Sequence, residues 1–211
     1  MAERQAILDA GLQYAAKAGL TARAAELIAL GANVRSRNHF GNSALILAAQ
    51  TGNADTVRLL LERDADLNGV NDGGNAALHY AAYNRCADVA RTLMITGADV
   101  RLANARGETP LAYAAYSGDA TIVFGLIAAG APLDAQDSDG LTPLMNGVIR
   151  GHGDVVAALV RAGANLETAD SRGLSALAWA DLLGLETIGA ALRAASADAN
   201  AAKAALTTIA P

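Results

Sequence analysis

Leucine recurs along the chain at a fixed interval of 33 residues. Two columns of six leucines keep this interval: Leu12, Leu45, Leu78, Leu111, Leu144 and Leu177, and Leu27, Leu60, Leu93, Leu126, Leu159 and Leu192. Around each column lie short apolar segments bounded by glycine, a pattern typical of two short helices in every period. A constant period of this length predicts a stack of structural repeats.

Polar positions follow the same period and predict where each repeat turns. An Asn or Asp stands three residues before a periodic glycine: Asn38, Asn71, Asn104, Asp137 and Asp170. Such a pair indicates a turn, because the Asx side chain bonds nearby backbone and glycine accepts a positive φ. Hydroxyl residues follow where they can cap the first helix: Ser43, Thr109, Thr142 and Ser175. Pro110 and Pro143 come next, at the first helical position.

Paired alanines in the first helix, such as Ala81-Ala82, allow neighbouring helices to approach closely. The second helix ends on Gly-Ala pairs, such as Gly97-Ala98. The third repeat departs from the frame, with Ala76 in place of the cap and Arg85 in place of the turn glycine, and Asp64 replaces a glycine before it. We expect faster hydrogen exchange across residues 64–90 than across 105–160.

Several segments carry a family resemblance. Thr109-Pro110-Leu111, Thr142-Pro143-Leu144 and Leu78-His79-Tyr80-Ala81 resemble parts of the ankyrin signature Thr-Pro-Leu-His-x-Ala, at the ankyrin period. The resemblance covers residues from about 5 to 200. It implies a mainly α solenoid of paired antiparallel helices, with β-hairpin-like tips on one side and a concave face along the first helices.

The predicted architecture is one ankyrin repeat domain over residues 1–200 with six repeats, two of them caps, followed by a tail at 201–211. The repeats are expected at about 5–37, 38–70, 71–103, 104–136, 137–169 and 170–200. Leu8 replaces the turn glycine of the first repeat, so the chain is expected to start in a helix. Arg193 and Asp181 give the last repeat a polar outer face, and Leu192 is expected to be less covered than central leucines. Leu206 and Ile209 either fold back on the last repeat, or the C-terminal segment that carries them frays.

Composition and charge narrow the range of possible functions. A net charge of −5 without a basic stripe argues against nucleic-acid binding, and no apolar run is long enough to span a membrane. Cys86 is the single cysteine, which excludes an intramolecular disulfide. Without a signal-peptide pattern the expected location is cytoplasmic, or periplasmic if a signal has been removed. An Ala- and Arg-rich composition with few lysines is typical of a GC-rich bacterial source.

The chain shows no predicted catalytic, cofactor or metal site. His79 and His152 are interpreted as structural turn residues, and His39 as a tip residue. The acidic run from Asp134 to Gly140 resembles a calcium loop, but Ala135 and Asn146 stand where an EF-hand requires acidic residues. We therefore expect a protein that is not an enzyme.

Aromatic residues gather in two neighbouring columns of the first helix. One column holds Tyr14, Leu47, Tyr80, Tyr113, Asn146 and Trp179, and the other holds Lys17, Gln50, Tyr83, Tyr116, Ile149 and Leu182. Residues three apart share a helix face, so Tyr80, Tyr83, Tyr113 and Tyr116 should form one patch. Such residues are enriched at binding hot spots, and the alternative is that they fill space between helices.

The turn tips form a second candidate surface, because their residues vary while their frame stays constant. Phe40 and Arg106 are the sharpest candidates there. The predicted function is protein–protein interaction through the tyrosine columns, Trp179 and these tips, with a monomer in the unbound state. The partner would be a folded protein or a peptide segment. A small-molecule-binding or regulatory role of a tyrosine-lined groove is the alternative, and a module of a larger assembly is the third interpretation.

Overall fold

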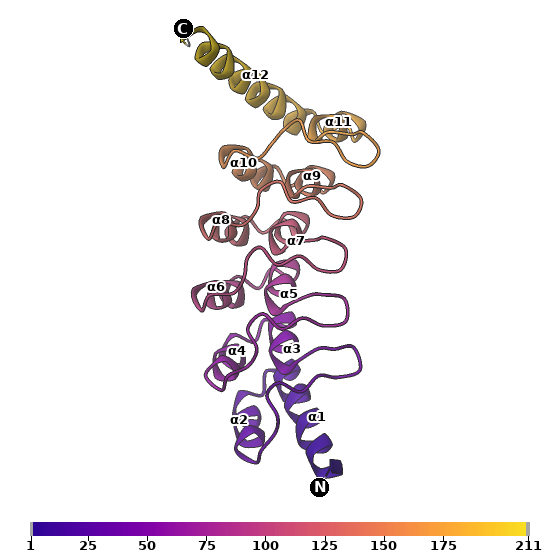
Figure 1. Cartoon of the computed structure of the whole chain (residues 1–211), viewed down its shortest axis with the longest axis vertical. Helices are drawn as coiled ribbons and strands as arrows, with labels where there is room; N and C mark the ends of the chain where they lie inside the picture. Colours follow the sequence, from indigo (N-terminus) through magenta and orange to yellow (C-terminus); the bar gives the residue numbers. More distant parts are fainter. Residues whose placement is uncertain (1, 210–211) are drawn as a thin grey trace.

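The protein is an elongated stack of helix pairs (Figure 1). The computed structural model describes the backbone of residues 2–209 and the side chains of residues 2–198. Within these residues the chain forms helices and no strand: α1 (Ala2–Ala18), α2 (Thr21–Ala29), α3 (Ala44–Gln50), α4 (Ala54–Leu61), α5 (Ala77–Tyr83), α6 (Ala87–Ile95), α7 (Pro110–Ser117), α8 (Ala120–Ala128), α9 (Pro143–Ile149), α10 (Gly153–Arg161), α11 (Ala176–Leu182) and α12 (Glu186–Ile209).

The helices form two parallel rows (Figure 1). The first helix of each pair packs on the first helices of the adjacent pairs, as α5, α7 and α9 do. The second helices form the other row, from α2 to α12. Long loops project beyond the row of first helices on one side of the stack. This arrangement confirms the predicted all-α repeat solenoid; the exact number and bounds of the repeats stay a prediction.

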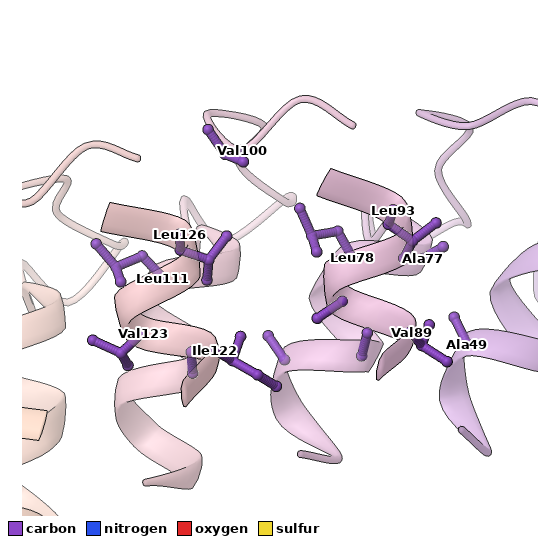
Figure 2. Close-up of a cluster of buried hydrophobic side chains, with 14 of the residues drawn as sticks. Ala49, Ala77, Leu78, Val89, Leu93, Val100, Leu111, Ile122, Val123 and Leu126 are labelled. Carbon is purple, nitrogen blue, oxygen red and sulfur yellow. The ribbon is translucent and has the colours of Figure 1, made fainter. Parts of the chain in front are cut away.

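The two leucine columns lie in the core between the rows (Figure 2). Central members such as Leu111 and Leu126 are fully buried, and small alanines such as Ala81 and Ala82 let the helices approach. Leu177 is only half-buried. Because each pair buries its apolar face against its neighbours, the core is continuous along the stack.

Side-chain caps start most of the first helices, as the period predicts. The hydroxyl oxygens of Ser43, Thr109, Thr142 and Ser175 each accept the backbone N–H three residues on at 3.3 Å. The start of α5 reverses the direction of this bond. Ala76 has no acceptor, and Nδ1 of His79 instead accepts the backbone N–H of Ala76 at 3.1 Å. His79 thus holds the start of α5 through a different N–H, while its own backbone N–H donates to the Ala76 carbonyl at 3.1 Å.

The ends of the stack differ from its middle. The described residues begin in a helix, α1, as expected. In the last pair Leu192 is 2% exposed, so the expectation that it is less covered is wrong, because α12 packs on both α10 and α11. Arg193 and Asp181, which break the apolar pattern, pair with each other. Helix α12 continues past residue 200 to Ile209, while the side chains of Leu206 and Ile209 lie outside the described ones.

Each tip is held by its Asx side chain. In the fourth repeat Oδ1 of Asn104 accepts the backbone N–H groups of Arg106 and Glu108 at 2.9 and 3.0 Å. The same pair of bonds forms at Asn38, Asn71, Asp137 and Asp170.

Successive tips are also joined through their backbones. The Ala105 N–H donates to the Gly73 carbonyl at 3.1 Å, and three equivalent bonds join the other tips. Gly74 has φ +77, and a Cβ there would lie 2.6 Å from the Ala105 nitrogen. Glycine is therefore required both by the turn and by the approach of the next tip.

Two non-glycine residues occupy the left-handed region that glycine fills in other repeats. Asp64 and Arg85 both have φ of 60°. We expect Arg85→Gly to stabilise the protein by about 0.5 to 1 kcal/mol, because the left-handed strain exceeds the extra chain entropy of glycine. Arg91→Gly inside α6 should destabilise by a similar amount. Urea unfolding measures the change in the free energy of unfolding for each variant. A change of the same sign in both variants would contradict the strain at Arg85.

Candidate functional site

A groove of about 590 Å³ lies over the first helices α5, α7 and α9 and the tips beside them. It is neither a sealed cavity nor a flat surface. The sequence-predicted residues that line it are Tyr80, Tyr83, Arg106, Tyr113 and Tyr116. The fold thus brings together five of the seven candidate residues, from two neighbouring repeats.

The aromatic rings of the groove pack on each other in a defined geometry. The ring of Tyr83 stacks on Tyr116 with centroids 6.1 Å apart and planes 16° apart. The rings of Tyr113 and Tyr83 meet edge to face, with centroids 5.5 Å apart and planes 88° apart. The Arg150 guanidinium lies over the ring of Tyr116, with its Cζ 4.6 Å from the ring centroid. Tyr83 and Tyr116 remain 46% and 38% exposed, so their rings form an open aromatic surface.

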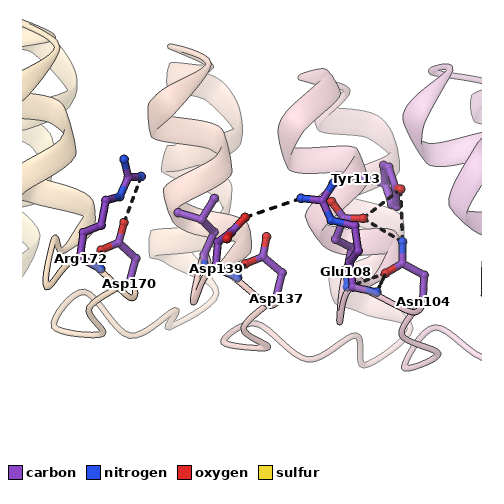
Figure 3. Close-up of polar contacts among 9 residues, drawn as sticks. Asn104, Glu108, Tyr113, Asp137, Asp139, Asp170 and Arg172 are labelled. Atoms are coloured by element: carbon purple, nitrogen blue, oxygen red, sulfur yellow. Dashed lines mark hydrogen bonds and ion pairs between the residues drawn. The ribbon is translucent and has the colours of Figure 1, made fainter. Parts of the chain in front are cut away.

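Tyr80 and Tyr113 are half-buried and held by hydrogen bonds. The amide of Asn71 donates to the Tyr80 hydroxyl at 2.9 Å. The Tyr113 hydroxyl donates to Oε2 of Glu108 at 3.1 Å and accepts from the amide of Asn104 at 3.3 Å (Figure 3). Burial first, and then the Glu108 carboxylate, raises the pKa of Tyr113 to about 12. These two tyrosines therefore support the groove, and the exposed ring surface belongs to Tyr83 and Tyr116.

His79 closes the floor of the groove beneath Tyr113. The two rings meet edge to face with centroids 5.8 Å apart. Burial lowers the pKa of His79 from 6.5 to about 4, so the imidazole is neutral at pH 7. Because Nδ1 accepts from Ala76, Nε2 carries the proton and donates to the Glu108 carbonyl at 3.2 Å. Both nitrogens are thus engaged in structural bonds, as the interpretation of His79 as a turn residue requires.

The end of the groove at the fifth repeat is polar. Glu108, Asp137 and Asp139 line it with Asn146, which is 8% exposed. Arg106 reaches across from the preceding tip to Asp139 at 3.6 Å, and both side chains are exposed (Figure 3). From the sequence, Asn146 was placed in the tyrosine column, but Glu108, Asp137 and Asn146 were not selected as site residues. The signal was present, because an acid replaces Asn in the turn column and Asn146 replaces an aromatic in the tyrosine column.

Two predicted site residues lie away from this groove. Trp179 is 8% exposed, its Nε1 donates to Oδ2 of Asp170 at 3.1 Å, and Arg172 lies over its ring with Cζ 4.4 Å from the centroid. Phe40 is 60% exposed at its tip and contacts His39, with ring centroids 3.9 Å apart. Trp179 therefore has a packing role and little free surface, while the role of Phe40 stays a prediction.

The remaining candidate residues have structural roles or form no site. Among the described residues, no cluster of three or more His, Cys, Asp or Glu side chains is arranged to hold a metal ion. Within the same part of the chain no helix combines the length and apolar character needed to cross a membrane. His152 bonds the Tyr116 carbonyl through Nε2 at 3.2 Å, as expected of a turn residue.

The comparison with protein families identifies the fold. No curated protein matches the sequence. The family model described as ankyrin repeats (3 copies) matches three overlapping segments, residues 12–104, 91–170 and 111–203. Ankyrin repeats are generally protein–protein interaction modules and typically non-enzymatic scaffolds. Since the matches span nearly the whole stack of helix pairs and agree with its period, the chain belongs to the ankyrin repeat family.

Proposed function

We propose that this protein binds a segment of another protein in the groove over α5, α7 and α9, without catalysing a reaction. The observation that carries the proposal is the stacked pair Tyr83 and Tyr116, whose rings stay partly exposed to solvent although they are rigidly supported. Rigid aromatic rings bind at a low cost in side-chain entropy, because few torsions are left to freeze. Exposed rings beside a groove are typical of an interaction surface.

The surroundings of the two rings favour a preformed site. Tyr113 holds Tyr83 from below, and its own hydroxyl is fixed by Glu108 and Asn104. The tips beside the groove are joined by the Ala105–Gly73 backbone bond and its equivalents. A preorganised surface loses little freedom on binding, so more of the contact energy remains as affinity. The partner would lie along the first helices and contact Arg106 at the flanking tip.

A selection from a displayed library of random linear peptides on the intact chain tests this function. We expect Tyr83→Ala and Tyr116→Ala each to weaken the selected peptides by about 2 kcal/mol or more, as central aromatic anchors do. Neither variant should lower the melting temperature by more than a few degrees, because both rings are exposed. Isothermal titration calorimetry measures the affinities, and circular dichroism measures the melting.

Tyr14→Ala is the matched control, because Tyr14 is a 71% exposed tyrosine in the neighbouring column, with Tyr80 and Tyr113, and lies two repeats away from the groove. It should leave the peptide affinity unchanged. Peptides that bind all three variants equally would show that the groove is not the binding surface, and the tip around Phe40 would become the leading candidate.

A second candidate function rests on the volume of the groove. About 590 Å³ lies within the range of small-molecule sites, and the convergent polar groups at its fifth-repeat end could orient a ligand. A compound that raises the melting temperature of the natural chain, but not that of Tyr83→Ala, would support this regulatory role. If peptides raise the melting temperature and small compounds do not, the result supports a protein partner.

A further inference from the structure

The boundary between the fourth and fifth repeats lacks an amide donor that the preceding boundary has. Between the third and fourth repeats the amide of Asn104 donates to Oδ1 of Asn75 at 2.9 Å. At the next boundary the corresponding residues are Asp137 and Glu108. The Asp137 side chain carries no N–H donor, and its Oδ1 already accepts two backbone N–H groups of its tip. Two carboxylates thus occupy the positions of a donor and its acceptor.

Asn146 supplies an independent sign that this place is made for a ligand. The residue is 8% exposed, it lines the groove, and its side chain makes no hydrogen bond within the described part of the chain. In the tyrosine column Asn146 stands where the neighbouring repeats carry Tyr113 and Trp179. A shorter amide replaces a large ring and leaves space beside Asp137. We call Glu108, Asp137 and Asn146 the acidic corner.

The sixth repeat shows what the equivalent position holds when it is filled. There the guanidinium of Arg172 lies 3.4 Å from Oδ2 of Asp170 (Figure 3). It also lies over the ring of Trp179. The Asp170 side chain is fully buried under this group. In the fifth repeat the residue that corresponds to Arg172 is Asp139. The acidic corner therefore receives no guanidinium from its own tip.

Charge favours a cationic occupant. The charged residues that line the groove are the carboxylates of Glu108, Asp137 and Asp139 and the guanidinium of Arg106. Three negative charges and one positive charge leave a net charge of −2 there, and Arg106 is directed to Asp139. Arg150, the other nearby cation, lies over Tyr116 instead.

We propose that the acidic corner binds an arginine side chain of the partner protein, an inference that rests on the proposed function of the groove. Oε1 of Glu108, Oδ2 of Asp137 and the Asn146 amide offer acceptors that form no hydrogen bond within the described residues. A guanidinium presents five N–H donors in one plane and stacks on aromatic rings, so it matches these acceptors beside Tyr113. Lysine presents a compact charge and would match the corner less well.

The test is an NMR titration of the intact chain with N-acetyl-arginine amide, compared with N-acetyl-lysine amide. We expect arginine amide to shift the Asn146 side-chain amide and the backbone N–H of Asp139 in a saturable manner, with several-fold weaker binding of lysine amide. Asp137→Asn should weaken the arginine probe at least tenfold. This variant keeps Oδ1 for the tip and matches Asn104, so it is expected to fold.

Asp154→Asn on α10 is the control, because it makes the same charge change on an exposed residue away from the groove. It should leave the titration unchanged. Equal binding of the two probes, or a response that Asp137→Asn does not reduce, would overturn the arginine assignment.

The peptide selection tests the proposed function independently of the NMR titration, which tests the arginine assignment. Peptides that require Tyr83 but contain no arginine would keep the function of the groove and overturn the inference. Saturable arginine binding at the corner, with peptides that do not depend on Tyr83 or Tyr116, would support the corner and overturn the function.

Discussion

Replacing Leu126 by alanine is expected to lower the free energy of unfolding by about 2 to 5 kcal/mol, the range for a fully buried leucine. Leu126 is 0% exposed and lies in α8 at the centre of the stack, between the two helix rows (Figure 2). The loss combines the transfer of the leucine side chain with the cavity that its neighbours cannot fill. Urea unfolding followed by circular dichroism measures the change.

Leu182→Ala provides the control, because Leu182 is 66% exposed at the end of α11. It should change stability by less than about 0.5 kcal/mol, as exposed substitutions usually do. Leu192→Ala is expected to cost about as much as Leu126→Ala, because Leu192, on α12 itself, is only 2% exposed where this helix packs on α10 and α11. A small loss at Leu126 would show that the core of the stack is not packed as described.

Acidification is expected to destabilise the protein through His79 by about 2 kcal/mol at pH 5 and about 3 kcal/mol near pH 4, by proton linkage. In the folded chain burial lowers the pKa of His79 from 6.5 to about 4. Above pH 6.5 the imidazole is neutral in both states. Below it the unfolded chain takes up the proton first, so stability falls until the pH reaches the folded pKa. Urea unfolding between pH 7 and 4 measures the loss.

The double variant Ala76→Thr with His79→Met separates this effect from the titration of carboxylates. It reproduces the arrangement of the fifth repeat, where the Thr142 hydroxyl caps α9 through the Met145 N–H. The variant should keep its stability to a lower pH than the natural chain. Identical pH profiles for the two proteins would show that His79 does not carry the acid sensitivity.

The period predicted most of the fold because each repeat uses the same local rules. The Asx turns, the hydroxyl caps and the leucine columns depend on residues within one period, so they can be read directly from the sequence. The contiguity of Tyr80, Tyr83, Tyr113 and Tyr116 followed from the same frame. The coverage of Leu192 did not, because it depends on how α12 packs on α10 and α11.

The candidate site was only partly predictable, because the exposure of a side chain depends on partners in adjacent repeats. Column position placed Tyr80 and Trp179 with the exposed rings, but Asn71 and Asp170 bind their polar atoms and draw them inward. The acidic corner arises where two repeats depart from the frame, the fourth at Glu108 and the fifth at Asp137 and Asn146. None of these departures indicates a site alone, and only their adjacency in the groove does.

In each tip, the residues that determine the loop conformation are different from the residue that is available to contact a partner. One Asx side chain and backbone bonds set each loop, so the residue two positions after it, such as Phe40 or Arg106, contributes no side-chain bond to its own loop. Substitution there can change the chemistry of one tip while the ladder of tips keeps its spacing. The protein can therefore evolve toward a new partner, or be redesigned for one, by exchanging single tip residues with little loss of stability.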